Sequence, residues 1–186
     1  MIRRLPNARE DAFMRAAQLH QETFPDSYRD LSEAMDDLID ILKAEGLLFV
    51  AEEDGDLVGV IGAVKQYPSA WELHPLVVAP SERGRGVGRA LVMRLESELR
   101  ERGALVVYLG TDDERFATSL SEGDLFMDTF GKIGRIRNFA RHPYGFYVRC
   151  GYAIVGVIPD ANGFHKPDII MAKRLREYPS DADTRS

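Results

Sequence analysis

The chain has 186 residues, enough for one domain with a sizeable core, and 45% hydrophobic with 29% charged residues is a globular composition. The net charge of −6 argues against a nucleic-acid-binding protein, the apolar runs are too short to cross a membrane, and the N-terminal residues lack the apolar stretch of a secretory signal. A single cysteine, Cys150, excludes an internal disulfide framework, and the four histidines share no metal-ligand spacing, so no metal is expected. We therefore expect a soluble cytoplasmic protein with neither nucleic-acid nor membrane partners.

Hydrophobic periodicity predicts an α/β chain. The expected elements are a helix over 8–21 with Asn7 as N-cap, a helix over 32–44, strands over 47–53, 57–65 and 71–79, a helix from 87 to about 102, a strand over 104–109, short helices over 125–130, 133–139 and 143–150, and strands over 152–158 and 169–173. The pair Asp54-Gly55 favours a tight hairpin, and Gly103 is placed to end the long helix. We expect one domain over 1–176 and a disordered tail over 177–186.

Charges are segregated along the chain. Residues 83–94 hold four arginines and no acid, whereas 26–40 and 112–128 each hold six acids and one arginine. One anionic and one cationic ligand would explain this layout, although a merely solvated surface would also produce it.

A glycine-rich turn lies between the strand predicted at 71–79 and the following helix. Glycines at 84, 86 and 88 let the backbone approach a ligand, and the helix that follows adds its positive end, which favours a phosphate or pyrophosphate. Arg89-Ala90 replaces the Lys-Ser/Thr of a P-loop, and the third glycine of a dinucleotide-binding turn is absent. The pattern Arg-x-x-Gly-x-Gly from Arg83 resembles the acetyl-CoA pyrophosphate loop of the Gcn5-related N-acetyltransferase (GNAT) superfamily. The alternative is an ordinary glycine turn between a strand and a helix.

Other strings narrow the resemblance to one branch of that superfamily. They are Trp-Glu-Leu-His-Pro-Leu-Val-Val at 71–78, Leu-Gly-Thr-Asp-Asp at 109–113, His-Pro-Tyr-Gly-Phe-Tyr at 142–147, Asn-Gly at 162–163 and Lys-Pro-Asp-Ile at 166–169, in addition to Phe-Tyr-Val-Arg-Cys-Gly-Tyr at 146–152, which resembles a later helix of the superfamily as a whole. Together they are similar to the aminoglycoside 6′-N-acetyltransferase type I family, from about residue 1 to 175.

The resemblance implies a fold, a co-substrate and a partner. The fold would be the GNAT fold, a mixed and mostly antiparallel sheet flanked by helices, in a homodimer. Acetyl-CoA would be the co-substrate, its pantetheine arm paired with a strand and its pyrophosphate held by the glycine-rich turn. The residues implied are Leu76, Val77 and Val78 for the arm and Arg83, Gly84, Arg85, Gly86, Val87, Gly88 and Arg89 for the pyrophosphate.

Acetyl transfer to an amine requires that the amine lose a proton, that the oxyanion be stabilised and that the leaving thiolate be protonated. Glu72 and His74 lie at i and i+2, on one face of the predicted strand. The resemblance implies that Glu72 positions the amine and accepts its proton, directly or through water, with His74 a second candidate. It also implies that the Leu76 amide stabilises the oxyanion and that Tyr147 protonates the thiolate. The alternatives are a half-exposed strand face for Glu72 and His74 and a core aromatic for Tyr147.

Carboxylates that directly follow a strand could hold a polycationic substrate. Asp112, Asp113 and Glu114 follow the strand predicted at 104–109, where sheets often present ligand sites. The alternative is an N-cap cluster that complements a helix dipole. Phe24, in place of a tryptophan of close relatives, and Tyr67, in a loop one residue shorter, are also expected near the substrate.

The expected function is transfer of acetyl from acetyl-CoA to the 6′-amino group of aminoglycosides by direct attack, which would confer antibiotic resistance. The alternatives are an acetyltransferase for another amine, such as a polyamine or a protein lysine, and an acyl-CoA sensor without turnover.

Overall fold

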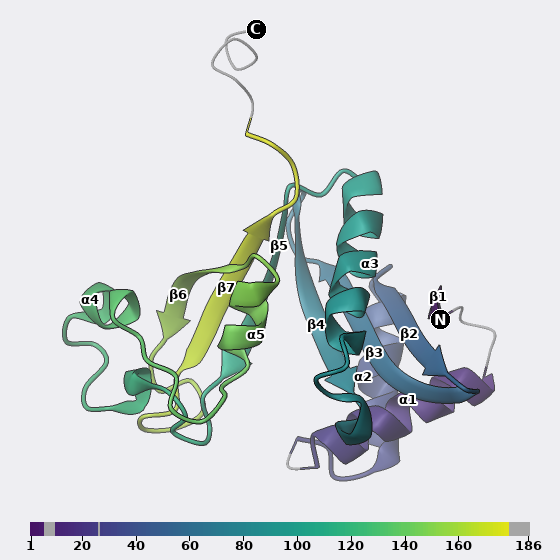
Figure 1. The fold of residues 1–186 in the computed structure, drawn as a ribbon, viewed down its shortest axis with the longest axis horizontal. Helices are drawn as coiled ribbons and strands as arrows, with labels where there is room; N and C mark the ends of the chain where they lie inside the picture. Colours follow the sequence, from purple (N-terminus) through teal and green to yellow (C-terminus); the bar gives the residue numbers. More distant parts are fainter. Residues whose placement is uncertain (6–9, 26, 179–186) are drawn as a thin grey trace, which may run out of the picture. The chain divides into compact units, whose positions relative to one another are not determined.

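The computed structural model describes residues 1–5, 10–25 and 27–178 (Figure 1). Its elements are β1 (Ile2–Arg4), α1 (Glu10–Thr23), α2 (Leu31–Lys43), β2 (Leu47–Glu53), β3 (Asp56–Lys65), β4 (Ala70–Val78), η1 (Pro80–Glu82), α3 (Val87–Glu101), β5 (Val106–Asp112), η2 (Ser119–Ser121), α4 (Thr129–Gly134), α5 (Tyr144–Arg149), β6 (Ala153–Ile158) and β7 (Asp168–Arg174). The seven strands follow the order β1-β2-β3-β4-β5-β7-β6. The predicted α/β class with a mostly antiparallel sheet is confirmed. The predicted N-cap Asn7, the first acid of the segment 26–40 and residues 179–186 of the predicted tail lie outside the described residues.

The chain divides into two compact units. The first consists of residues 1–107 and the C-terminal residues from 175, and the second of residues 108–174. The single domain expected over 1–176 stays a prediction.

In the first unit, helices pack on both faces of an antiparallel sheet. Alanines and leucines of α1 and α2, among them Ala16 and Leu38, form a buried cluster with Val60 of β3 and Val77 of β4. The adjacent Gly59 faces the other way, because a Cβ added there would meet Leu91 of α3 at 2.8 Å. The alternation of side chains along β3 therefore separates α1 and α2 from α3.

Local turn chemistry behaves as the sequence predicts. Asp54 and Gly55 have φ of 51° and 89°, the left-handed conformations that a two-residue hairpin between β2 and β3 requires. Gly103, with φ of 82°, follows the C-terminus of α3. The short strand β1 was not predicted, because three residues give no readable alternation; it pairs with β2, and Arg3 forms an ion pair with Glu52.

The pairing of β3 with β4 contains a bulge next to the residues predicted to be catalytic. Ile61 lies opposite Leu76 and Ala63 opposite Leu73, so Gly62 faces both His74 and Pro75. A Cβ on Gly62 would lie 2.4 Å from the carbonyl oxygen of His74, closer than side-chain atoms approach backbone. The bulge therefore requires glycine at this position.

Gly62→Ala is expected to destabilise the protein by about 1–3 kcal/mol, the usual cost of overpacking, because the backbone at His74 must move. Thermal unfolding measures the effect, and Gly156→Ala in β6 is the control, since a Cβ there meets nothing within 4 Å. Equal melting temperatures for the two variants would contradict the requirement for glycine at 62.

The second unit corrects two predicted helices. Neither 125–130 nor 133–139 is a helix as predicted; α4 occupies only Thr129–Gly134. Asp128 has φ of 61°, which prevents a helix from continuing through it. The Asn138 side chain both accepts from the backbone amide of His142 and donates to its carbonyl, and this holds the later segment in a turn.

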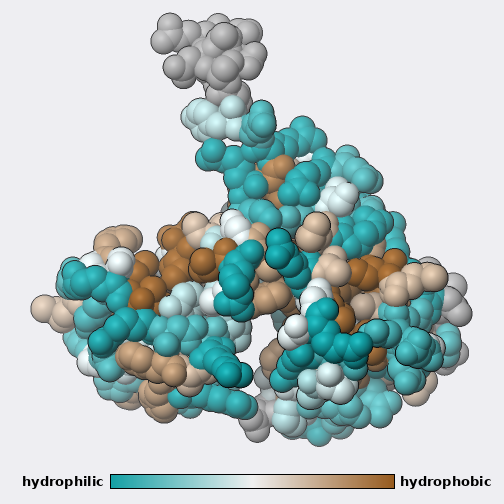
Figure 2. Space-filling model, viewed as in Figure 1, coloured by the Kyte–Doolittle hydropathy of each residue, from teal (hydrophilic) through white to brown (hydrophobic). Residues whose placement is uncertain are grey.

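Apolar side chains are also exposed on the second unit. The surface near α4 and β6 is partly brown in Figure 2, and Phe130 and Phe164 are 84% and 87% exposed. Other apolar side chains of this unit, among them Phe126, Met127 and Phe139, are more than half exposed.

Candidate functional site

The glycine-rich turn has the geometry of an anion-binding backbone. Gly84 and Gly86 have φ of 81° and 93°, and Gly86 is the N-cap of α3 without a side-chain cap. The first amides of a helix have no acceptor within the helix, and a Cβ at either glycine would meet nothing within 4 Å. Within the described part of the chain, no hydrogen bond engages the amide of Gly84 or Gly86. The amides are thus available to an anionic ligand.

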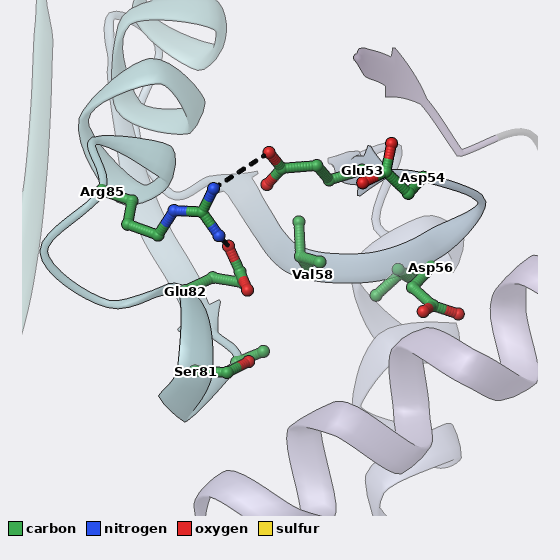
Figure 3. A pocket seen from close by; sticks show the side chains of 9 residues that line it. Glu53, Asp54, Asp56, Val58, Ser81, Glu82 and Arg85 are labelled. Atoms are coloured by element: carbon green, nitrogen blue, oxygen red, sulfur yellow. Dashed lines mark hydrogen bonds and ion pairs between the residues drawn. The ribbon is translucent and has the colours of Figure 1, made fainter.

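The arginines of this turn differ in how far the protein already engages them. Arg83 donates from Nε to the carbonyl of Val78 at 3.1 Å. Arg85 pairs with Glu82 and with Glu53, as the dashed lines in Figure 3 show. Since two carboxylates neutralise the Arg85 guanidinium, it adds less to anion binding than the sequence suggested, and the main-chain amides carry more of that role.

Beside this turn lies a hollow of about 290 Å³ that the sequence did not predict (Figure 3). It is lined by Glu53, Asp54, Asp56, Leu57, Val58, Ala79, Ser81, Glu82 and Arg85. With four carboxylates against one guanidinium, the hollow repels phosphate, so a pyrophosphate belongs at the amides of the turn rather than inside it.

Strand β4 presents the two residues predicted for proton transfer on one face. Glu72 and His74 alternate with the buried Trp71 and Leu73, and the carboxylate of Glu72 accepts from the side-chain amide of Gln66 at 3.0 Å. The bulge then shifts the alternation, so that Leu76 lies opposite Ile61, Val77 opposite Val60 and Val78 opposite Gly59.

A group of polar side chains around His74 was not recognised from the sequence. The Asp37 carboxylate of α2 lies 3.1 Å from Nε2 of His74 and accepts from the Tyr28 hydroxyl at 3.1 Å, and His20 of α1 is 3.6 Å away. The signal for Asp37 was its place on the helix, three residues after Ala34 and four before Ile41, both buried. A carboxylate at the edge of an apolar helix face needs a polar partner.

The pKa values in this group diverge. Burial lowers the pKa of His20 to about 4, which outweighs the charge of Asp37 and keeps His20 neutral at pH 7. Burial also lowers the pKa of His74, but the hydrogen bond and charge of Asp37 outweigh it, and the pKa is raised above its ordinary value. Burial raises the pKa of Asp37, but the hydrogen bond and the charge of His74 outweigh it and leave the pKa of the carboxyl below its usual range.

Phe24 and Tyr67, both predicted to contact substrate, lie on the first unit. The Phe24 ring packs edge-on against His20 with 5.7 Å between ring centres, and it is partly exposed. Tyr67 is 63% exposed in the turn before β4. Phe24 is therefore next to the polar group around Asp37.

Of the three acids at the end of β5, which the structure extends to Asp112, Asp113 does not fit the predicted role. Its side chain is fully buried, and its carboxylate accepts from the amides of Ala117 and Thr118 and from the hydroxyls of Thr118 and Ser121. Burial raises the pKa of Asp113, but these hydrogen bonds outweigh it and lower the pKa below its usual range. The prediction of Asp113 as a substrate ligand is corrected: its carboxylate is buried and holds the following turn, and the N-cap of the short helix there is Thr118, not an acid.

Asp112 and Glu114 are exposed on the same segment. The Asp112 carboxylate accepts from Asn162, and its carbonyl lies 3.0 Å from Nε2 of His142. Asn162, which belongs to one of the strings shared with the aminoglycoside acetyltransferase family, thus donates a hydrogen bond to the last residue of β5 within the second unit.

Tyr147 lies in α5, and its ring packs against Phe146 and Tyr152. Burial raises its pKa well above the ordinary value, so the phenol stays protonated at neutral pH. Within the described residues nothing hydrogen-bonds to its hydroxyl, which leaves that group able to donate. The alternative, in which Tyr147 is only a core aromatic, explains the contacts of its ring but not a hydroxyl group that is left able to donate.

Among the residues described, no three His, Cys, Asp or Glu side chains are arranged to hold a metal ion. No described helix combines the length and apolarity needed to cross a membrane. The cytoplasmic location stays a prediction.

Comparison with known proteins identifies relatives along nearly the whole chain. An aminoglycoside 6′-N-acetyltransferase solved with coenzyme A is 40% identical, with a TM-score of 0.92 over 97% of this chain and 99% of that chain. The aminoglycoside 6′-N-acetyltransferase from Enterococcus faecium is also 40% identical, with a TM-score of 0.91 and the same coverage.

A curated relative, N-acetyltransferase family 8 member 2 of Rattus norvegicus, is 37% identical over 103 residues, which are 50% of this chain and 46% of that protein. This chain thus matches about half the length of that relative. The model of the acetyltransferase (GNAT) family matches residues 13–119, more than half of the chain. The resemblance found in the glycine-rich turn is confirmed, and the chain belongs to the acetyltransferase (GNAT) family.

Proposed function

We propose that this protein transfers the acetyl group of acetyl-CoA to the 6′-amino group of aminoglycosides. The observation that carries the proposal is the similarity, at a TM-score of 0.92 and over 97% of the chain, to an aminoglycoside 6′-N-acetyltransferase that holds coenzyme A. The open amides of Gly84 and Gly86 support acetyl-CoA as the donor.

The chemistry assigns one task to each residue of the first unit. The Glu72 carboxylate attracts and positions the cationic amine, with one oxygen already oriented by Gln66. His74 is the base that takes the proton of the amine, since an imidazole is the side chain most often used for proton transfer in catalysis and this one is exposed beside Glu72 on the same strand face. The backbone amide of Leu76 stabilises the oxyanion that forms when the nitrogen attacks the thioester carbonyl.

When the tetrahedral intermediate collapses, the C–S bond breaks and the thiolate of CoA needs a proton. Tyr147 supplies it in this proposal, because its phenol is protonated at neutral pH and its hydroxyl is not used by the described part of the chain. Asp112 and Glu114 add negative charge that attracts a polycation.

A panel of acceptors tests the proposal by measuring release of free CoA thiol. The panel contains a kanamycin-type drug with a 6′-amino group, its analogue with a 6′-hydroxyl group, spermidine and a lysine-containing peptide. We expect turnover with the 6′-amino drug and none above background with the 6′-hydroxyl analogue. Equal rates with all the amines would refute aminoglycosides as the substrate class, and binding of CoA without any turnover would indicate a sensor.

Resistance and a homodimer, both implied by the resemblance, are part of this proposal. Expression in a susceptible bacterium is expected to raise the minimal inhibitory concentration of 6′-amino drugs, while the 6′-hydroxyl analogue keeps its potency. The exposed apolar side chains of the second unit, such as Phe130 and Phe164, support a dimer. Light scattering measures the mass in solution, which for a dimer is twice the chain mass of 20.9 kDa.

A further inference from the structure

Side chains from three separate segments meet at the Asp37 carboxylate. His74 reaches it from β4, with Nε2 3.1 Å from one oxygen and 3.3 Å from the other. The Tyr28 hydroxyl donates to it from the segment between α1 and α2, and Nδ1 of the buried His20 approaches it from α1 at 3.6 Å. A half-buried carboxylate thus accepts hydrogen bonds from groups that the chain brings from far apart.

Within the described ranges, the only partners of Asp37 that could carry a positive charge are these two imidazoles, since no lysine or arginine pairs with it. Of the two imidazoles, His74 is the one that can carry the charge at neutral pH, because His20 is buried and its pKa of about 4 leaves it neutral. His20 therefore fills space beside Asp37 without neutralising it, and its ring centre lies 6.2 Å from that of His74. The negative charge of Asp37 acts mainly on His74.

The hydrogen bond fixes which nitrogen of His74 carries the proton. An ionised carboxylate only accepts hydrogen bonds, so Nε2 of His74 must be the N–H nitrogen. In the neutral imidazole Nδ1 is then the acceptor. Since 49% of the His74 side chain is exposed, this acceptor belongs to a ring that solvent and ligands can reach.

We propose that Asp37 is the positioning residue for His74 in acetyl transfer, holding its Nε2–H so that Nδ1 takes the proton of the acceptor amine. This inference rests on the proposed function. The nitrogen lone pair forms the C–N bond, the C–S bond breaks with its electrons on sulfur, and the amine proton moves to Nδ1 of His74. The resulting imidazolium faces the Asp37 carboxylate. This carboxylate stabilises the positive charge, as the aspartate of a Ser-His-Asp triad stabilises the imidazolium of its histidine.

The charged and titratable groups that face His74 predict the direction of a pH effect. They are Asp37 from α2, His20 from α1, Tyr28 from the segment between these helices, and Glu72 from β4 itself. Asp37 raises the pKa of His74, so its removal lowers that pKa and moves the acidic limb of the rate profile to lower pH. The plateau falls at the same time, because the base is weaker and no longer held.

Asp37→Asn tests the proposal, with Asp36→Asn as the matched control. Both variants remove one negative charge from α2, but Asp36 is exposed. The histidine resonances of the free protein are titrated by NMR, and the pH profile of kcat/KM is measured with the panel amine that turns over best. Thermal unfolding confirms that each variant is folded.

For Asp37→Asn we expect a lower His74 pKa and a plateau lower by about tenfold, part of the 10²–10⁴ that general-base catalysis contributes. In the His74→Asn background, Asp37→Asn is expected to have no further effect on the rate, because the two residues act as a unit. Asp36→Asn should match the wild type in both measurements.

Superimposable pH profiles of Asp37→Asn and wild type would overturn the proposal, as would equal rate losses from Asp37→Asn with and without His74. An unchanged His74 pKa would overturn it as well, and this result needs no substrate. Because the profile is taken with the best acceptor of the panel, failure on aminoglycosides would refute the proposed substrate alone.

Discussion

Gly86→Asp is expected to abolish binding of acetyl-CoA. Gly86 has φ of 93° and caps α3 with its amide open, so a side chain there places bulk and negative charge where the pyrophosphate would accept hydrogen bonds. For the wild type, CoA at 100 times its Kd stabilises the fold by about 2.7 kcal/mol, which raises the melting temperature by roughly 5–10 °C for a chain of this size. The variant should show no shift.

Gly86→Asn separates charge from strain in this experiment. Asparagine matches aspartate in size and tolerates the left-handed conformation, but it has no charge. We expect it to retain weak binding of CoA that titration calorimetry detects, whereas Gly86→Asp shows none. A normal CoA-dependent shift for Gly86→Asp would contradict the assignment of the turn as the pyrophosphate site.

Tyr147→Phe is expected to lower kcat by about 10²-fold, the lower range for general acid–base catalysis, while the Kd of acetyl-CoA changes little. The ring contacts with Phe146 and Tyr152 survive the change, so only the hydroxyl donor is lost. The rate at which free CoA thiol is released gives kcat, and titration calorimetry gives the Kd of acetyl-CoA.

Tyr144→Phe, three residues earlier in the same helix, is the control for loss of a hydroxyl from α5. It should retain kcat. If Tyr147→Phe turned over as the wild type does, with the same pH–rate profile, the role of acid would be excluded and Tyr147 would be a core aromatic.

Some parts of the candidate site could be predicted because they depend on local backbone geometry. The glycines at 84 and 86 adopt positive φ, which the sequence marks by the residue type itself. The shared face of Glu72 and His74 follows from the period of two along a strand, and it holds up to the bulge at Gly62.

Other parts could not be predicted because they depend on what packs nearby. Asp113 belongs to a run of acids that the sequence predicts to be exposed. In the structure it is buried, and its carboxylate accepts four hydrogen bonds from the following turn. The sequence predicts Arg85 as a phosphate ligand. In the structure it pairs with Glu53 at the end of β2, which lies 32 residues earlier in the chain. Neither partner could be found from spacing, since each depends on how the loops fold back.

The sequence by itself determined the class of fold, the hairpin at Asp54-Gly55 and the glycine-rich turn before α3, because these follow from periodicity and from conformations that only certain residues adopt. Only the tertiary structure decided that Asp37 meets His74, 37 residues later in the chain. Such a pair forms when α2 packs on the sheet, and the burial of apolar side chains that drives this packing is not directional. It therefore leaves no local pattern to show which carboxylate lies beside which imidazole.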